Sequence, residues 1–394
     1  MPAQAPPYEQ VHTRTVALGG QAFQLITKPG MPDWDTVGPA ERLLYEAARP
    51  PAGARVALLA SGNAALAAAL ALRDRPAALL FSNLSAIGIA MARRTFAANA
   101  LGNAQVLDGI SLLPEHAGSC GLALLLAPPD RRLARRRLLE AFGALAEGGA
   151  LLLAGANDHG IRSIIDDAGA LFGGAAVLAY GGGCRVAQAL KRTPGGALPA
   201  WAGAPGIAPG SWAEFEAELR GVRLRLCGLP GVFAHDRLDE GTRLLIETIE
   251  QPTGLRVLDL GCGGGAIGAV AARLGAAHAE LADANMLAVA AATATLARNG
   301  IGNASVHAAD GVPPERHAAY DLVLSNPPFH VGKAVTYDIA QAFIAQARRA
   351  LRPGGRFVLV ANQFLRYDQL LRASFARADC LAQSRGYRVW AAAA

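Results

Sequence analysis

Lysine, aromatic residues and long apolar runs are all scarce in this sequence of 394 residues. Only three of its 37 basic residues are lysine, aromatic residues make up 6% of the chain and charged residues 17%. Intrinsic disorder requires low hydrophobicity and high charge density, and 52% hydrophobic residues exclude it. No apolar run approaches the roughly 18–20 residues of a membrane span. No basic stretch followed by an apolar core opens the sequence, so we expect neither a membrane partner nor a secretory signal.

Paired cysteines are missing as well. The five cysteines are an odd number, lie far apart and form no Cys-x-x-Cys pair. This spacing argues against a disulfide framework and against a zinc site. We therefore expect a cytoplasmic protein of two or three domains that holds no metal.

Arginine supplies the positive charge that lysine does not. The formal net charge of +6 permits an anionic partner such as RNA, and guanidinium groups match phosphate oxygens better than ammonium groups do. The densest cluster, at residues 131–137, holds five arginines. It fits a solvent-facing helix equally well, so charge alone is weak evidence for RNA binding.

A Pro/Gly-rich stretch at residues 191–212 divides the sequence. Proline and glycine are too dense there for a regular element, so we predict a linker. On both sides, apolar runs end in small-residue turns and alternate with alanine-rich helical stretches. This alternation is typical of an α/β sheet with helices on both faces. We predict one domain over residues 1–190 and a second over residues 213–394.

The two domains also resemble each other. Four short blocks recur in the same order about 200 residues apart. They are Arg55–Leu59 with Arg256–Leu260, Ala98–Asn103 with Arg298–Asn303, Ala127–Pro129 with Asn326–Pro328, and Leu153–Asn157 with Val358–Asn362. Chance similarity between alanine-rich pieces does not explain four blocks in order, so we infer a duplicated domain.

The second copy carries a glycine-rich turn. In the segment VLDLGCGGG, an apolar strand ends in Asp259, and Gly261, Gly263 and Gly265 form a turn before a helix predicted from Ala266. Glycine lets a backbone turn tightly and approach a ligand. The overlapping GGGAIG also fits the fingerprint of a dinucleotide dehydrogenase. The acid two residues before the first glycine favours S-adenosylmethionine (SAM), because it can meet an ammonium group that NAD lacks.

Two further acids lie at predicted strand ends. Asp283 ends the strand Ala279–Asp283, and its carboxylate can accept hydrogen bonds from both ribose hydroxyls. It can also cap the helix predicted over Ala288–Arg298. Asp310, before Gly311, ends a third strand at a place where an adenine amino group can be recognised. The interpretation of Asp310 as an ordinary turn residue is nearly as good.

The strongest signal is the segment SNPPFH, which follows the apolar strand Tyr320–Leu324. Pro327 and Pro328 fix φ and have no N–H, so their carbonyls are rigid acceptors. With the amide oxygen of Asn326 they can hold a planar exocyclic amine and aim its lone pair at a methyl donor, and such orientation is a large share of catalysis. Phe329 offers a face for a base. Alternatively, Asn-Pro-Pro is an ordinary turn and Phe329 a core residue. The position of the segment after the fourth strand of a glycine-loop domain favours a catalytic site.

Together these motifs resemble a class I SAM-dependent methyltransferase that modifies amino groups. The segments LPGVF at 229–233, RLDEGT at 237–242 and VANQFL at 360–365, with the duplication, narrow the resemblance to the ribosomal RNA small subunit methyltransferase C family. The resemblance is strong over residues 228–394 and weaker over residues 50–190. Members of this family are tandem-domain enzymes that methylate N2 of guanine in 16S rRNA. A sister family that acts on guanine N2 in large-subunit rRNA shares nearly all these motifs.

The resemblance implies two Rossmann-like domains, SAM as the cofactor and a ribosomal RNA guanine as the target. Asn326, Pro327, Pro328 and Phe329 would hold the guanine and carry catalysis. We assign His330 to substrate contact only, since a methylated nitrogen loses its proton without a strong base. The residues expected at the cofactor are Asp259, Gly261, Cys262, Gly263, Gly265, Asp283, Ala284, Asp310, Gly311 and Asn326.

The first copy has lost these groups. The replacements are Leu58 for Asp259, Ala60 for Gly261, Ala64 for Gly265, Asn83 for Asp283 and Ala127 for Asn326. An apolar residue cannot bond an ammonium group, and alanine has no amide oxygen. We predict that residues 1–190 bind no SAM and serve as a scaffold or an RNA-docking domain, with steric support of the second domain as the simpler alternative.

Two other classes of function stay open. The same pocket serves another planar amine, such as a guanine of large-subunit rRNA, adenine N6 or a protein glutamine. A non-catalytic RNA-binding assembly factor is the second alternative, and the intact motifs of the second copy argue against it. These alternatives leave open which nucleotide and which ribosomal subunit are modified, and whether the substrate is naked RNA or a ribosomal particle. The oligomeric state is open as well.

Overall fold

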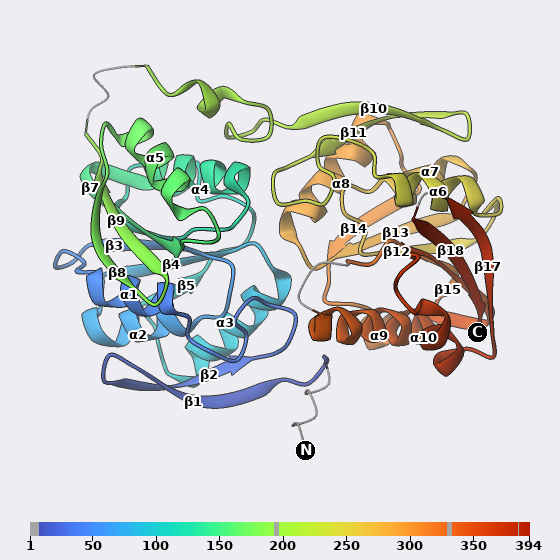
Figure 1. Ribbon diagram of the computed structural model, residues 1–394, viewed down its shortest axis with the longest axis horizontal. Coiled ribbons are helices and arrows are strands. Elements are labelled where there is room, and N and C mark those ends of the chain that lie inside the picture. Colours follow the sequence, from blue (N-terminus) through green and yellow to red (C-terminus); the bar gives the residue numbers. More distant parts are fainter. Residues whose placement is uncertain (1–7, 193–196, 329–332, 385) are drawn as a thin grey trace. The chain divides into compact units, whose positions relative to one another are not determined.

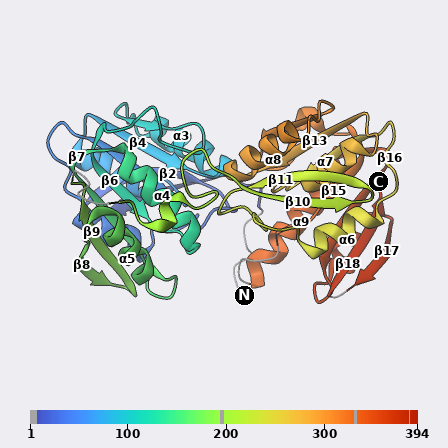
Figure 2. The ribbon, with the colours of Figure 1, turned by 90° about the horizontal axis from the view of Figure 1, so that it is seen from above.

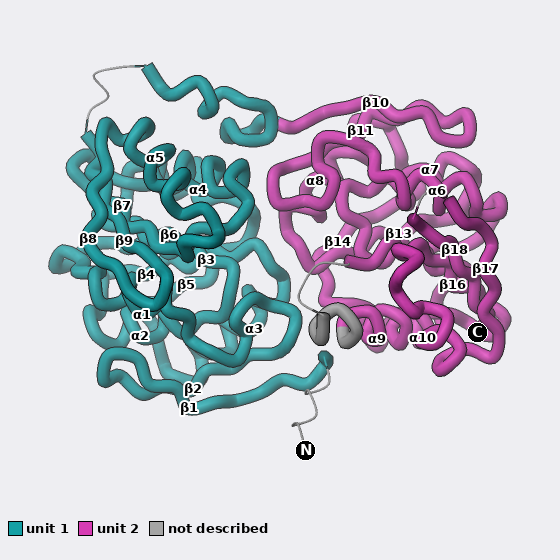
Figure 3. Tube along the Cα trace, in the orientation of Figure 1, with its two compact units in different colours: residues 1–211 teal, residues 212–394 magenta. Residues whose placement is uncertain are grey.

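The computed structural model describes residues 8–192, 197–328, 333–384 and 386–394. The chain divides into two compact units, unit 1 over Met1–Ser211 and unit 2 over Trp212–Ala394 (Figure 3). Each unit pairs a two-stranded hairpin with a seven-stranded sheet.

Unit 1 alternates strands and helices along most of its length (Figure 1). Its elements are β1 (His12–Leu18), β2 (Gln21–Thr27), α1 (Pro39–Ala47), β3 (Arg55–Ala60), α2 (Ala65–Asp74), β4 (Ala78–Asn83), α3 (Ala86–Ala98), β5 (Ala104–Val106), β6 (Cys120–Leu126), α4 (Arg131–Ala144), β7 (Leu145–Ala156), α5 (Ile161–Phe172), β8 (Ala176–Gly181), β9 (Cys184–Leu190) and η1 (Ala200–Gly203). The sheet order is β5-β4-β3-β6-β7-β9-β8, with β9 antiparallel to β7 and β8 and the other neighbours parallel.

Unit 2 repeats this architecture. Its elements are β10 (Ala213–Leu219), β11 (Val222–Gly228), α6 (Glu240–Thr248), β12 (Arg256–Leu260), α7 (Ala266–Arg273), β13 (His278–Asp283), α8 (Met286–Arg298), β14 (Ala304–Ala308), η2 (Pro314–Arg316), β15 (Tyr320–Ser325), α9 (Lys333–Ala350), β16 (Leu351–Asn362), α10 (Tyr367–Ser374), β17 (Arg377–Ser384) and β18 (Tyr387–Ala393). The sheet order is β14-β13-β12-β15-β16-β18-β17, with β18 antiparallel to β16 and β17. The predicted α/β fold with two tandem Rossmann-like domains is confirmed.

Two apolar layers cover the sheet of unit 2. Side chains alternate along each strand, so Val257 packs with α6, α7 and α8, whereas its neighbour Leu258 packs with α9 and α10. In Figure 1, α9 and α10 lie on the opposite side of the strands from α6 and α7. Strands buried on both faces read as continuous apolar runs, which is why the sequence indicates them clearly.

The repeated blocks at the ends of α3 and α8 each contain an asparagine that attaches the helix to the hairpin of its unit. Asn299 accepts a hydrogen bond from Arg225 N (3.0 Å) and donates one to Arg225 O (2.8 Å), which fixes the β10–β11 hairpin beside α8 (Figures 1 and 2). In unit 1, Asn99 makes the same pair with Gln24 of β2, at 2.9 and 2.7 Å. A side-chain amide suits this task because it both donates and accepts.

The segment predicted as a linker packs in part onto unit 1. Ala202 and Ile207 are buried among residues of α4 and α5, and Arg136 donates a hydrogen bond to Gly206 O at 3.0 Å. Proline and glycine exclude long helices and strands here, and they do not prevent burial.

The arginine cluster on α4 is largely engaged within unit 1. Arg131 and Arg135 both pair with Asp167, at 2.7 and 2.9 Å. Arg136 and Arg137 are buried, and Arg137 pairs with Glu140 at 2.6 Å. The cluster is therefore mainly structural, and it is neither a fully solvated helix face nor a free phosphate-binding surface.

Candidate active site

The residues of the glycine turn and of the Asn-Pro-Pro segment meet at the carboxyl edge of the unit 2 sheet. β12 and β15 are parallel neighbours, and the sheet order reverses between them. The Ser325 hydroxyl donates to Leu260 O at 2.7 Å and ties the two strand ends together. Gly261 and Asn326 follow directly, so both lie at the topological switch point where α/β sheets bind ligands.

The glycine turn adopts a backbone that other residues resist. Gly261, Gly263 and Gly265 have φ of 77°, 53° and 83°, in the left-handed region. A Cβ at Gly265 would also lie 3.0 Å from Ala292 Cβ. The N–H groups of Gly261 and Cys262 donate to Ala282 O at 2.9 and 3.1 Å and attach the turn to the end of β13. Gly263 has open space around the position of a Cβ, so the turn is tightly anchored yet accessible.

Asp259 is fully buried beneath this turn. Its Oδ2 accepts a hydrogen bond from Gly268 N at 2.9 Å in the first turn of α7, and its Oδ1 has no hydrogen-bond partner within the described residues. Burial, with a contribution from the charge of Asp283, raises the pKa of Asp259 to about 7. One carboxylate oxygen thus supports the helix start, and the other is left to meet a donor from a ligand.

Asp283 closes the turn from the end of β13. Its two oxygens accept hydrogen bonds from Gly263 N (2.9 Å) and Asn285 N (2.8 Å), and they keep further acceptor capacity. Burial raises the pKa of Asp283. Ala284 follows directly and is half-buried. The cap of α8 is Asn285, which accepts from Leu287 N at 3.0 Å, so the helix begins at Met286 and Asp283 is not its N-cap.

Asp310 and Gly311 lie on the loop after β14 and are half-buried. Gly311 has φ of 87°, and a Cβ there would collide with the side chain of the buried Gln346 of α9. Both the conformation and the close contact therefore require glycine at this position.

Asn326 has a fixed side-chain amide. Its Nδ2 donates to Asp239 Oδ2 at 3.1 Å and to Thr242 Oγ1 at 2.9 Å. Its Oδ1 is buried and has no partner among the residues that the structure describes. A buried acceptor without a donor costs about 1–3 kcal/mol, so this oxygen is suited to receive an N–H of a substrate.

The rest of the Asn-Pro-Pro-Phe-His segment is only partly described. Pro327 is buried and Pro328 is exposed. Phe329 and His330, which we expected at the target base, lie outside the described residues. Their predicted roles stay predictions.

Three polar residues near Asn326 were not among the expected site residues. Asp239 is the N-cap of α6 and accepts from Thr242 N at 2.9 Å. The hydroxyl of Tyr387, at the start of β18, lies 3.5 Å from Asp239 Oδ1. The pattern Asp-x-x-Thr before an apolar helix indicates a capping pair, and nothing in it points to an asparagine more than 80 residues further along the chain.

The described groups fit the binding of SAM at this edge. The unpartnered Asp259 Oδ1 suits an ammonium group, Asp283 suits ribose hydroxyls, and the space beside Gly263 admits a ligand close to the backbone. No cluster of metal-ligating side chains and no helix long and apolar enough to cross a membrane occurs in the described part of the chain.

The corresponding turn of unit 1 differs in its backbone and in its side chains. Ala64 has φ of −95° where Gly265 has 83°, so the turn takes another path. Asn63 and Asn83 are buried, and Asn83 donates to Gly62 O at 2.9 Å. Amides bonded to the chain itself thus occupy the place where unit 2 presents a carboxylate.

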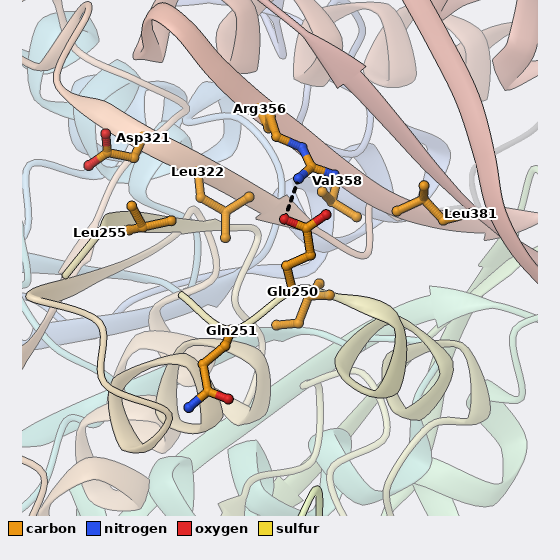
Figure 4. Close-up of a pocket in the computed structure, with 9 residues that line it drawn as sticks. Glu250, Gln251, Leu255, Asp321, Leu322, Arg356, Val358 and Leu381 are labelled. Atoms are coloured by element: carbon orange, nitrogen blue, oxygen red, sulfur yellow. Dashed lines mark ion pairs between the residues drawn. The ribbon is translucent and has the colours of Figure 1, made fainter. Parts of the chain in front are cut away.

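A small cavity of unit 2 lies elsewhere, at the amino-terminal ends of the strands (Figure 4). Leu255, Asp321 and Leu322 line it together with an ion pair of 2.7 Å between Arg356 and Glu250. It faces away from the carboxyl edge and holds none of the expected site residues.

Comparisons with known proteins identify relatives of this chain. A family model described as Methyltransferase small domain matches residues 223–391. The ribosomal RNA small subunit methyltransferase C of Chromohalobacter salexigens is 36% identical over 276 residues, which cover 68% of this chain and 77% of the relative. That of Shewanella loihica is 33% identical over 270 residues, covering 68% and 75%. A T. thermophilus 16S rRNA N2 methyltransferase, solved in complex with AdoMet and guanosine, matches with a TM-score of 0.79 and 30% identity over 98% of both chains.

Proposed function

Because this chain belongs to the ribosomal RNA small subunit methyltransferase C family, we propose that it transfers a methyl group from SAM to the exocyclic N2 of a guanine in 16S rRNA. Ribosomal RNA as the substrate also implies work in the cytoplasm. The unpartnered, buried Oδ1 of Asn326 is the observation that carries the proposal. An exocyclic amine is the group that can donate to such an acceptor, and the glycine turn lies beside it at the same edge of the sheet.

Asn326 orients the target nitrogen. Its Oδ1 accepts one hydrogen of the guanine amine, and we assign the Pro327 carbonyl to accept the other. Two acceptors on one amine oppose the delocalisation of its lone pair into the ring and expose that pair. Positioning of this kind is a large part of catalysis for a direct displacement, and no strong base is needed because the nitrogen becomes acidic once it carries the methyl group.

The glycine turn and its acids hold the cofactor. SAM, when bound, supplies the methyl group from its sulfonium. Asp259 Oδ1 would take the ammonium group and Asp283 the ribose hydroxyls, while Gly261, Gly263 and Gly265 leave the backbone accessible. Asp310 would lie near the adenine, with Cys262, Ala284 and Gly311 completing the wall.

Two exposed aromatic residues flank this edge. Phe233 is 59% exposed and Phe364 72% exposed. Phe233 lies in the loop that joins Gly231, which accepts from Asn285 at 2.8 Å, to the Asp239 cap. Phe364 follows β16, whose last residue pairs with Tyr387. Stacking of a base on such a ring is worth about 1–3 kcal/mol. We propose that the target nucleotide lies in a loop or in naked, unassembled RNA and not in a closed helix, since a base must leave its stack to be modified.

Unit 1 supports this enzyme without a cofactor of its own. Its turn is closed by Asn63 and Asn83, and Ala127 stands where unit 2 has Asn326. We propose that it is a scaffold or a docking domain for RNA.

Replacement of Asn326 tests the function. We expect Asn326→Ala to lower the transfer of labelled methyl to unmodified 16S rRNA by more than about 100-fold, with the affinity for SAM nearly unchanged in calorimetry. Asn157→Ala, a change of an amide in unit 1, is the control and should keep full activity. Label found as N6-methyladenosine, in large-subunit rRNA or in protein would point to another planar amine, and full turnover by Asn326→Ala would overturn the assignment.

A further inference from the structure

We propose that Asp239 and Thr242 are positioning residues that set the orientation of the Asn326 amide. The inference rests on the proposed function, in which Asn326 Oδ1 accepts the target amine. The two residues receive both hydrogens of Asn326 Nδ2, at 3.1 Å for Asp239 Oδ2 and 2.9 Å for Thr242 Oγ1. Neither residue needs to touch the substrate, because each acts through Asn326.

The chemistry of Asp239 permits only one orientation of the amide. An ionised carboxylate accepts hydrogen bonds and cannot donate one. If the amide of Asn326 turned by half a rotation, its oxygen would face the carboxylate oxygen across about the same distance. That arrangement is repulsive, and it would also present an N–H to the target amine, which needs an acceptor. The carboxylate thus sets the identity of the atom offered to the substrate.

Asp239 is itself fixed from two further directions. Its Oδ2 also accepts Thr242 N at 2.9 Å, which caps α6, and its Oδ1 lies 3.5 Å from the Tyr387 hydroxyl. Burial and the charge of Asp239 raise the pKa of Tyr387, so this phenol keeps its proton. A Cβ at Gly241 would lie 2.8 Å from the Tyr387 ring, so a glycine is needed for the tyrosine to approach. The ends of α6, β15 and β18 are joined through these contacts.

The first copy of the domain shows that the group is dispensable for the fold. Gly38 is the N-cap of α1 as Asp239 is of α6. Three residues further on, Glu41 stands for Thr242, and Cys184 opens β9 where Tyr387 opens β18. Ala127 stands for Asn326. The copy that lacks the amide therefore lacks all three of its supports, although its sheet, helix and hairpin are retained.

A matched pair of variants at Thr242 tests the inference in the full chain. Thr242→Val removes the hydroxyl that accepts from Asn326 and keeps the shape, whereas Thr242→Ser keeps a hydroxyl. We expect Thr242→Val to lower kcat for methyl transfer to 16S rRNA by about tenfold, with the affinity for SAM and the melting temperature nearly unchanged. Thr242→Ser should restore most of kcat. Equal turnover by Thr242→Val and the wild type would overturn the role of Thr242.

Asp239→Ser separates the cap of α6 from the effect on Asn326. Serine can still accept from Thr242 N, so the fold should persist, and its neutral, shorter side chain no longer dictates the orientation of the amide. We expect kcat to fall by about tenfold to a hundredfold with SAM binding retained. Unchanged kcat would overturn the inference while the loss of activity in Asn326→Ala still supported the proposed function. Full activity of Asn326→Ala would overturn both.

Discussion

At the scale of single residues, two carboxyl groups are buried at helix starts. Glu41 accepts Gly38 N at 2.9 Å at the beginning of α1, and Asp259 accepts Gly268 N at 2.9 Å near the beginning of α7. Each hydrogen bond favours the ionised form, yet burial outweighs it and raises the pKa of both groups to about 7. Asp259 can be compensated by a cationic ligand group, whereas Glu41 lies in unit 1, away from the expected cofactor residues.

Glu41 makes stability depend on pH. Its folded-state pKa of about 7 exceeds the usual 4.5, so the folded state binds the proton more tightly, and stability falls as pH rises from about 4.5 to 7. We expect Glu41→Gln to raise the free energy of unfolding by about 1–3 kcal/mol at pH 8 and by little at pH 4.5. Urea titrations at both pH values measure this. Glu46→Gln, at an exposed place on the same helix, is the control, and an equal gain at both pH values would contradict the account.

At the scale of elements, α8 connects the hairpin to the glycine turn. Thr295 is fully buried, and its hydroxyl accepts from Cys227 N at 3.0 Å and donates to Gly264 O at 2.9 Å. Thr95 of α3 accepts from Ile26 N in the same way at 3.0 Å. A hydroxyl can join two backbone groups of opposite kind, so one threonine holds three segments together.

Loss of this hydroxyl should loosen unit 2. We expect Thr295→Val to lower the free energy of unfolding by about 1–3 kcal/mol, because Cys227 N and Gly264 O are left without their partner. Affinity for SAM should also fall, since the glycine turn loses its attachment to α8. Denaturant titration and calorimetry measure the two effects. Thr293→Val, two residues away on the exposed side of α8, should change neither, and full stability of Thr295→Val would refute this role.

At the scale of the whole molecule, one fold occurs twice, and the two copies differ at the edge where the site residues are expected. The two sheets have the same strand order and the same antiparallel strand. What differs is chemistry at the carboxyl edge, where unit 2 presents Asp283 and a left-handed Gly265, and unit 1 presents a buried Asn83 and Ala64. The fold depends on apolar side chains that are buried on both faces of the sheet. A site depends on a few polar side chains that the packing of these faces does not require.

This asymmetry predicts one SAM per chain. We expect Asp283→Ala to abolish the uptake of SAM by the full chain, because Asp283 anchors Gly263 and is the residue that we propose for the ribose hydroxyls. Asn83→Ala, the aligned change in unit 1, should leave the stoichiometry and affinity for SAM unchanged. Calorimetry with the two variants decides the matter. Two bound SAM molecules in the wild type would show that unit 1 binds the cofactor, and retained uptake in Asp283→Ala would contradict the role of Asp283.

The sequence by itself determined the fold class, the duplication and the edge at which the expected site residues meet. Apolar runs mark strands that are buried on both faces, glycines mark the turn, and parallel strands bring residues that follow them to one edge. Asp283 and Asn326 could be placed there because each directly follows or ends a strand. These patterns are local, so they can be recognised without knowing how distant parts of the chain pack.

Only the tertiary structure decided which partners hold Asn326. Asp239 and Thr242 precede it by 87 and 84 residues, and Asp239 lies 148 residues from Tyr387. Their meeting depends on the docking of α6 and on the strand order that places β18 beside β16, which no short segment encodes. The cap of α8 at Asn285 and the burial of Arg136 and Arg137 were settled in the same way, because a side chain's partner depends on which elements pack around it.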